Sequence, residues 1–215
     1  MRFCIAGYGK FGRRALAMLH VSFPNALITV VELRLGDSDN EVKAGVTFVR
    51  EDVVSFLSGS SDIGPTDWII PTVPFHLAAS LVLAGLPGAR AAHIPERTLS
   101  IAPNPYPVNH SSICYSVADF ICPDACPEGD LCSVTGEYRE PLCLRLKQTE
   151  IPGFKLSVLR SRQILPGIGG YQVADLHTLT RQVGPGNNLI ATACKCHAIL
   201  TGIKRENRSE KPDPT

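Results

Sequence analysis

The chain has 215 residues, of which 44% are hydrophobic and 19% are charged, and its formal net charge is +1. This composition supports a packed core and excludes disorder as the overall state. The near-zero net charge gives no electrostatic reason to expect nucleic acid or an anionic membrane as a partner. The length predicts one domain with an insert, or two small domains.

The sequence shows no export signal and no membrane-spanning segment. The N-terminal apolar run is short and is broken by glycines. Residues 68–89 carry no Asp, Glu, Lys or Arg, but three prolines interrupt them, so a buried strand and a buried helix explain them better than a span. We therefore expect a cytoplasmic protein, in which the eight cysteines stay reduced.

Short β-branched runs alternate with segments of helical spacing, which is typical of α/β proteins. The predicted strands are Arg2–Ala6, Ile28–Leu33, Val46–Val49, Asp67–Ile70, Leu99–Ala102, Lys155–Ile164 and Leu189–Ala193. The predicted helices are Phe11–His20, Phe75–Leu86, Tyr171–Val183 and Cys196–Lys204. The fold class expected is α/β, a Rossmann-like doubly wound, mostly parallel sheet with an irregular cysteine-rich insert.

The same pattern predicts four segments. Residues 1–102 form the N-terminal Rossmann half with a dinucleotide site, and residues 103–152 form the cysteine-rich insert, which would act as a lid. Residues 153–204 form a βαβα unit that completes the sheet. Residues 205–215 are polar, end in prolines and form a flexible tail.

A glycine-rich turn directly follows the first predicted strand. Its sequence, GYGKFG, fits the G-x-G-x-x-G pattern and opens a predicted helix, and Glu32 ends the next predicted strand. The glycines allow a tight turn, close approach of a pyrophosphate and close helix packing, while the helix N-terminus attracts the phosphates. A carboxylate at Glu32 accepts ribose hydroxyls and repels a 2′-phosphate, so NAD is favoured over NADP. The turn supplies Gly7, Gly9, Lys10, Phe11 and Gly12 as candidate contacts.

With these residues the chain resembles the NAD(P)-binding Rossmann superfamily. Over about the first 100 residues it is similar to the nucleotide-binding domains of TrkA-type potassium-uptake regulators and of saccharopine-dehydrogenase-like reductases. The resemblance implies cofactor contacts by Gly7, Gly9, Gly12 and Glu32. It also implies that Asp52 lies near the adenine, and that Pro71 and Thr72 lie near the nicotinamide.

Six residues in two distant groups are candidate metal ligands. Cys122, Cys126 and Cys132 have the spacing C-x3-C-x5-C in a loop rich in Pro, Gly and acidic residues. The second group follows the last predicted strand and consists of Cys194, Cys196 and His197. Thiolates select zinc, copper(I) or iron–sulfur clusters. Metal binding, thiol redox chemistry and structural thiols all stay open, with an iron–sulfur cluster and zinc equally favoured among the metals.

The remaining cysteines divide differently. Cys4 lies inside the first predicted strand and is expected to pack in the core, while Cys114 and Cys143 are left unassigned.

Ligands of open parallel sheets bind at the carboxyl ends of the strands, and most candidate residues follow predicted strands. We therefore expect the insert to fold over that edge, so that both cysteine groups form one site. The turn at Gly167–Tyr171 is either an anion-binding helix start or a tight strand–helix connection. Weak catalytic candidates at the same edge are His76, Asn104 and Tyr106.

The pattern favours an NAD-binding oxidoreductase with a cysteine-ligated metal or iron–sulfur centre near the cofactor. Two alternatives stay open: a non-enzymatic nucleotide- and redox-sensing subunit like the potassium-uptake regulators, and a structural zinc protein with a vestigial Rossmann site. The expected partners are a dinucleotide and either a small-molecule substrate or a protein, with no nucleic acid. A homodimer is left open.

Overall fold

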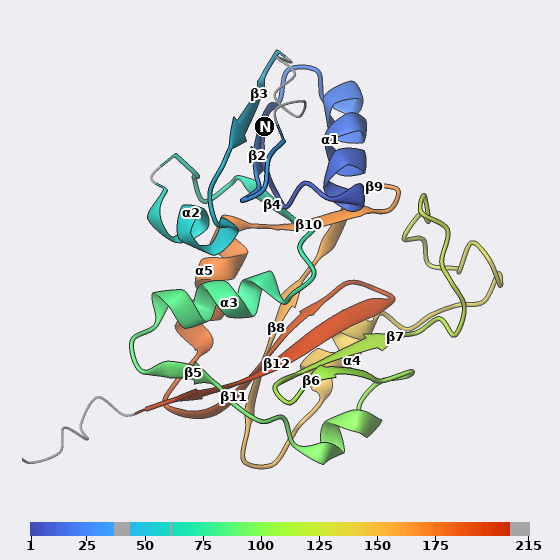
Figure 1. Cartoon of the computed structure of the whole chain (residues 1–215). Helices are drawn as coiled ribbons and strands as arrows, with labels where there is room; N and C mark the ends of the chain where they lie inside the picture. The colour runs from blue at the N-terminus through green and yellow to red at the C-terminus, as the bar shows by residue number, and fades with distance from the viewer. Residues whose placement is uncertain (37–43, 61, 207–215) are drawn as a thin grey trace, which may run out of the picture.

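The computed structural model describes residues 1–36, 44–60 and 62–206 (Figure 1). Within them the chain is a mixed α/β structure with two mixed sheets, so the expected α/β class is confirmed at this level. The elements are β1 (Arg2–Ala6), α1 (Lys10–Ser22), β2 (Leu27–Val31), β3 (Val46–Val49), α2 (Val53–Gly59), β4 (Trp68–Pro71), α3 (Leu77–Gly85), β5 (Ala89–Ala91), the 3₁₀ helix η2 (Glu96–Ser100), β6 (Tyr106–Asn109), β7 (Ser112–Ser116), α4 (Leu142–Gln148), β8 (Lys155–Arg160), β9 (Arg162–Leu165), β10 (Ile168–Gln172), α5 (Val173–Gln182), β11 (Gly186–Ala193) and β12 (His197–Arg205).

The first sheet has the order β3-β2-β1-β4-β10-β9. Its first four strands are parallel, and β10 and β9 continue the sheet in antiparallel fashion. Ile5 and Ile70, in the central strands, are almost completely buried, as expected for strands covered on both faces. The strands expected at the N-terminus are confirmed, and the turns after β1, β2 and β4 therefore meet at one edge.

The second sheet, β6-β7-β12-β11-β8 with β5 on the side of β12, corrects two expectations. Residues 196–204 were expected to be a helix, but all of them except Cys196 belong to β12, which pairs with β11 in a long hairpin. The β-branched residues Ile199, Thr201 and Ile203 alternate along it, which is typical of a strand. The apolar residues of this segment also fit a helical spacing, and the sequence analysis followed that spacing. Residues 99–102 were expected to be a strand, but they lie at and beyond the end of η2.

The C-terminal segment does not complete a single sheet. Residues 153–204 were expected to do so, but β9 and β10 join the first sheet while β8, β11 and β12 build the second. The segment 103–152 is also more regular than expected, since it contributes β6, β7 and α4. Its irregular portion lies between β7 and α4 (Figure 1).

The turn at Gly167 is part of a hairpin and does not open a helix. Residues 168–172 form β10, and the helix that follows begins at Val173. Gly167 has φ +74°, and a Cβ there would lie 1.8 Å from the carbonyl oxygen of Asp124. Glycine is required because the turn is left-handed and because the backbone of the insert crosses directly over it. Both interpretations left open for this turn, an anion-binding helix start and a strand–helix connection, are therefore wrong.

Helices cover the sheets in layers. The helix α1 packs on one face of the first sheet, with Ala15, Leu16 and Leu19 in the core. The helices α2, α3 and α5 share a buried cluster with residues of both sheets and lie between them (Figure 1). On the far face of the second sheet, α4 buries Leu142 and Leu146. The two sheets thus share a helical layer, which fixes the loops of the first sheet beside the strands of the second.

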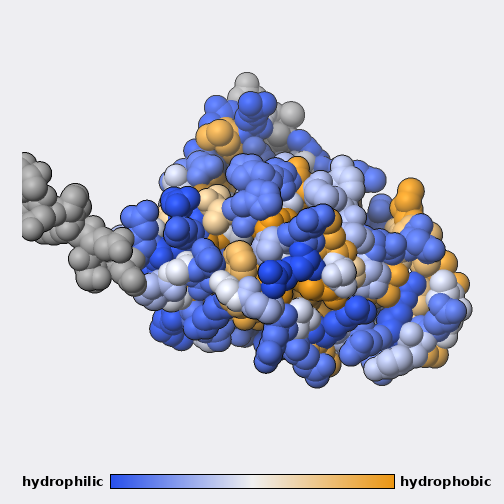
Figure 2. All heavy atoms as spheres, turned by 90° about the horizontal axis from the view of Figure 1, so that it is seen from below, coloured by the Kyte–Doolittle hydropathy of each residue, from blue (hydrophilic) through white to orange (hydrophobic). Residues whose placement is uncertain are grey.

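Apolar side chains reach the surface in separate areas with hydrophilic side chains between them, as Figure 2 shows for one face. Across the described ranges, no helix is both long and apolar enough to cross a lipid bilayer.

Candidate functional site

The glycine-rich turn connects β1 to α1. Gly7 has φ +102°, and a Cβ on Gly12 would lie 2.2 Å from the Gly7 carbonyl oxygen, so both positions require glycine. At Gly9, by contrast, a Cβ would meet no atom within 4 Å. Gly9 is also the N-cap of α1, which has no side-chain cap and no acidic residue in its first turn. The helix N-terminus therefore leaves its N–H groups and positive potential available.

Glu32 ties the end of β2 to this turn. Its Oε2 accepts a hydrogen bond from the Tyr8 backbone N–H at 2.9 Å, and its Oε1 accepts one from the Arg34 N–H at 3.0 Å. These bonds, that of Arg34 first, lower the pKa of the Glu32 carboxyl below its usual value. The carboxylate is therefore ionised and held beside the turn, with lone pairs left to accept further hydrogen bonds.

Thr72 and Asp52 have structural roles in the absence of a ligand. The Thr72 hydroxyl lies 2.9 Å from the carbonyl oxygens of both Ala6 and Gly7, which links the end of β4 to the turn. Asp52 is the N-cap of α2 and accepts a hydrogen bond from the Ser55 N–H at 2.9 Å. Thr72 thus lies at the expected cofactor edge, whereas the Asp52 carboxylate is already used by its own helix.

The insert contacts the beginning of α1. The Asp124 carboxylate lies 3.3 Å from the Arg14 guanidinium and 3.9 Å from the Lys10 ammonium. Phe11 is largely exposed and lines a cavity that residues of the insert also line. The Gly167 N–H donates to the Cys126 carbonyl at 3.1 Å, which anchors the insert on the β9–β10 hairpin as well. The insert therefore lies beside the glycine-rich turn.

That cavity, of about 440 Å³, is here called the cysteine cavity. It lies between the insert and the turn connecting β11 to β12. Its walls bring together all six candidate ligands, which the sequence places in two distant groups: Cys122, Cys126, Cys132, Cys194, Cys196 and His197.

Two of these thiols accept pairs of backbone hydrogen bonds. The Cys132 Sγ accepts from the N–H groups of Val134 and Thr135, both at 3.4 Å. The Cys194 Sγ accepts from the N–H groups of Cys196 and His197, at 3.4 and 3.3 Å. Converging N–H groups stabilise the negative charge of a thiolate. At Cys132 they lower the pKa of the thiol, with Arg139 contributing further.

Arg139 lines the cysteine cavity beside its thiols, and the sequence analysis missed it. Its Nη1 donates to the Cys196 Sγ at 3.8 Å, and its guanidinium lies 5.4 Å from the centre of the Phe120 ring. Burial, and then the charges of the neighbouring Cys126 and Cys196, raise the pKa of Cys122. The three sulfur atoms are therefore close enough for their thiolate charges to repel one another. In the sequence Arg139 is a single arginine between Cys132 and Cys143, and its distance from the cysteines matches no known ligand pattern, so nothing indicated its role.

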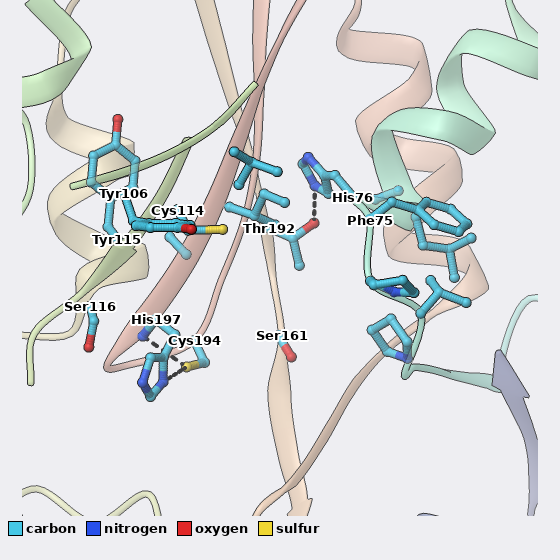
Figure 3. A pocket seen from close by; sticks show the side chains of 18 of the residues that line it. Phe75, His76, Tyr106, Cys114, Tyr115, Ser116, Ser161, Thr192, Cys194 and His197 are labelled. Carbon is cyan, nitrogen blue, oxygen red and sulfur yellow. Dashed lines mark hydrogen bonds between the residues drawn. The ribbon is translucent and has the colours of Figure 1, made fainter. Parts of the chain in front are cut away.

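Cys194 and His197 are close to Glu128, another residue that the sequence analysis missed. The Cys194 Sγ lies 4.0 Å from the His197 Nδ1 (Figure 3). The Glu128 carboxylate accepts a hydrogen bond from the Lys195 N–H, and it lines the cysteine cavity. Burial, followed by the charge of Glu128, raises the pKa of Cys194 to about 12. Cys194 is therefore a neutral thiol unless a cation displaces its proton.

The thiols surround the cysteine cavity without converging on one point. Among the residues that the structure describes, no group of three or more His, Cys, Asp or Glu side chains is arranged to hold a metal ion. Cys4 and Cys143 are buried in hydrophobic clusters, as expected for Cys4. Cys114 belongs to a neighbouring cavity.

This neighbouring cavity has a volume of about 600 Å³ and is here called the apolar cavity. It lies between the start of α3 and the second sheet, and Pro71 at the end of β4 forms part of its wall. Figure 3 shows Phe75 and His76 on one side, and Tyr106 and Cys114 on the other. All three weak catalytic candidates line it, and it shares Ser161, Cys194 and His197 with the cysteine cavity.

Of those candidates, His76 has no free ring nitrogen. Its Nδ1 lies 2.8 Å from the Thr201 hydroxyl, and its Nε2 lies 2.8 Å from the Thr192 hydroxyl, the second of which Figure 3 shows. Burial lowers its pKa to about 3. Asn104 has a left-handed backbone, φ 44°, and donates to the Ser116 carbonyl, while Tyr106 is exposed. The geometry favours a packing role for His76.

His76 predicts a pH dependence of stability. Its pKa falls from an ordinary 6.5 to about 3 on folding, so below pH 6.5 protons bind the unfolded chain preferentially. The stabilisation is complete above this range and is lost as the pH falls through it. We expect the free energy of unfolding to drop by about 2 kcal/mol more between about pH 7 and 5 than in His76→Gln. Urea unfolding at both pH values measures this difference; equal drops in the two proteins would contradict it.

Comparison with known proteins gives the family of the chain. Residues 76–206 match a family model described as "Uncharacterized protein, C-terminal domain". The chain belongs to this family. The matched residues include every strand of the second sheet, the whole insert and the six candidate metal ligands.

A relative from Archaeoglobus fulgidus, described as "Uncharacterized protein", is 27% identical over 221 residues, which cover 94% of this chain and 98% of the relative. The similarity therefore extends well beyond the matched domain. No solved structure matches the chain.

Proposed function

We propose that the protein is an oxidoreductase that binds a dinucleotide at the glycine-rich turn and carries a cysteine-ligated metal or iron–sulfur centre beside it. The observation that carries the proposal is the position of the cysteine cavity. Phe11 of the turn lines it, and Cys194, His197 and Ser161 separate it from the cavity that begins at Pro71. A nucleotide and a thiolate centre would thus share one wall.

The dinucleotide part rests on the first four strands. Their parallel order β3-β2-β1-β4 is that of a Rossmann mononucleotide-binding half, and the turn after β1 lies at the carboxyl edge. The open space at Gly9 and the uncapped N-terminus of α1 fit a pyrophosphate. Glu32 is ionised beside the turn and suits ribose hydroxyls, so NAD is favoured over NADP. The nicotinamide end would lie at Pro71 and Thr72, where it would accept or donate a hydride.

The metal part rests on the donor set. Thiols that ring a cavity of about 440 Å³ without converging suit a cluster of several atoms better than a single ion, which needs its ligands closer together. The backbone N–H groups at Cys132 and Cys194 would stabilise thiolates, and Arg139 would offset the negative charge of a thiolate cluster. We therefore favour an iron–sulfur cluster over zinc.

Asp124 is expected to weaken dinucleotide binding. Its carboxylate lies at the N-terminal end of α1, against Lys10 and Arg14, where a pyrophosphate needs positive potential. Removing that charge in Asp124→Asn frees both cations and removes a repulsion, so the Kd of NADH should fall about 3- to 10-fold. A fluorescence titration with NADH at low salt measures the change. Asp119→Asn, on the same insert, is the control, and equal Kd values for all three proteins would contradict the assignment.

The proposal as a whole is tested by an anaerobic titration with NADH. We expect saturable enhancement of NADH fluorescence and, with it, a change in the visible spectrum of an iron-containing centre, because the nucleotide would bind beside it. Unchanged NADH fluorescence at saturating protein would refute the dinucleotide site. NADH binding without any spectral change in an iron-containing protein would refute the proposal that the two sites lie side by side.

A second candidate function is a purely structural centre. No residue between Asp119 and Glu140 belongs to a buried hydrophobic cluster of the described chain, so this irregular part of the insert has no core of its own. A metal could hold such a segment, as it does in small metal-dependent modules. This reading predicts zinc, no colour and no response to NADH.

A further inference from the structure

The apolar cavity has a chemical character that neither the glycine-rich turn nor the cysteine cavity explains. We propose that it binds an uncharged, largely apolar organic molecule. The proposal depends on the proposed function only in taking this molecule to be the substrate of the oxidoreductase.

No Asp, Glu, Lys or Arg lines the apolar cavity. His76, on one side of it, is buried and neutral at pH 7, with both ring nitrogens at hydrogen-bond distance from threonine hydroxyls. A carboxylate, phosphate or ammonium group entering it would lose its hydration without gaining an opposite charge, which is strongly unfavourable. The walls therefore select against charged ligands.

The entrance of the cavity is apolar and exposed. Tyr106 and Val108 on β6 are 71% and 45% exposed, and Phe75 before α3 is exposed across from Tyr106 (Figure 3). Farther in, the wall is formed by residues such as Leu77, Ala198 and Ile199. Exposed apolar groups around an apolar hollow are typical of ligand sites, since a bound molecule removes their surface from water.

One buried polar group supplies a hydrogen-bonding position. Tyr171 lines the cavity and is 0% exposed, and its hydroxyl has no hydrogen-bond partner among the described residues. A buried hydroxyl without a partner is rare and unfavourable, and a ligand that carries a neutral polar group would satisfy it. The ligand class is thus an apolar body with a neutral hydrogen-bonding group, such as a carbonyl or hydroxyl.

Two dyes with the same ring system test the selectivity. N-phenyl-1-naphthylamine is neutral, whereas 1-anilinonaphthalene-8-sulfonate adds a sulfonate, and both fluoresce on entering apolar sites. We expect the neutral dye to bind the full chain with one saturable site and at least about tenfold tighter than the sulfonate. Equal or tighter binding of the sulfonate would overturn the proposal.

The position of the dye is tested with two variants. Val108→Trp fills the entrance and should weaken binding of the neutral dye at least about tenfold, measured beside a thermal melt that reports folding. Leu144→Trp is the matched control, because Leu144 is 47% exposed on α4 and lines neither the apolar nor the cysteine cavity. Unchanged binding in a folded Val108→Trp protein would overturn the proposal. NADH binding is measured in the same proteins, so failure at the glycine-rich turn is seen separately from failure at the cavity.

Discussion

A Gly9→Val protein is expected to fold normally and to bind NADH at least about a hundredfold more weakly. Gly9 has an ordinary φ of −71°, and a Cβ there meets no atom within 4 Å, so the valine side chain enters open space. In the proposed complex that space is filled by the pyrophosphate, which approaches the backbone closely. The measurement is a fluorescence titration with NADH, accompanied by a thermal melt.

Gly184→Val is the matched control for this variant. Gly184 also has open space around its Cβ position and lies between α5 and β11, away from the glycine-rich turn. The control should keep the affinity of the natural protein. If Gly9→Val retained full affinity, the dinucleotide would bind elsewhere and the assignment of the turn would be wrong.

The second large effect is expected at the cysteine cavity. Cys132→Ala and Cys196→Ala change one ligand from each of the two distant groups, and each alone should lower the bound metal per chain at least about tenfold. The reason is that a single centre needs ligands from both sides of the cavity, so losing either side releases it. Metal analysis after gel filtration under anaerobic conditions measures the effect.

The control is Cys114→Ala, which removes a half-buried thiol from the apolar cavity and should leave the metal content unchanged. If each of the two variants instead lost only a part of the metal, the chain would carry two separate centres. If neither lost any, these cysteines would not be ligands.

The N-terminal part of the fold could be predicted from the sequence because its signals are local. A short apolar strand, a glycine-rich turn and an amphipathic helix adjoin each other in residues 2–22, and Gly12 must be small to pack against the Gly7 carbonyl. The grouping of the two cysteine groups was also predicted, from the strand end before Cys194 and from an insert expected to fold over the same edge.

The second sheet could not be predicted in the same way. The pairing of β12 with β7 and β11 is decided by contacts between distant residues, and the apolar residues of β12 fit a helical spacing as well as an alternating one. The preceding β11 favours the strand over the helix, because a hairpin partner satisfies the backbone hydrogen bonds of β12. For the same reason the Gly167 turn was misread, since its geometry is set by the crossing insert.

The apolar cavity was only partly foreseen. His76, Asn104 and Tyr106 were singled out because they follow strands or lie near strand ends, and all three line it. Its neutral character and the unpartnered Tyr171 hydroxyl depend on which faces of two sheets meet, and no pattern in the sequence carries that information.

The most direct test of the account is metal analysis of the anaerobically purified protein together with its visible spectrum. We predict about one centre per chain, with iron and sulfide and a brown colour if the favoured cluster is present. A colourless, zinc-containing protein would support the structural alternative. A metal-free, colourless protein with eight titratable thiols would contradict the central claim that the two cysteine groups form one metal centre.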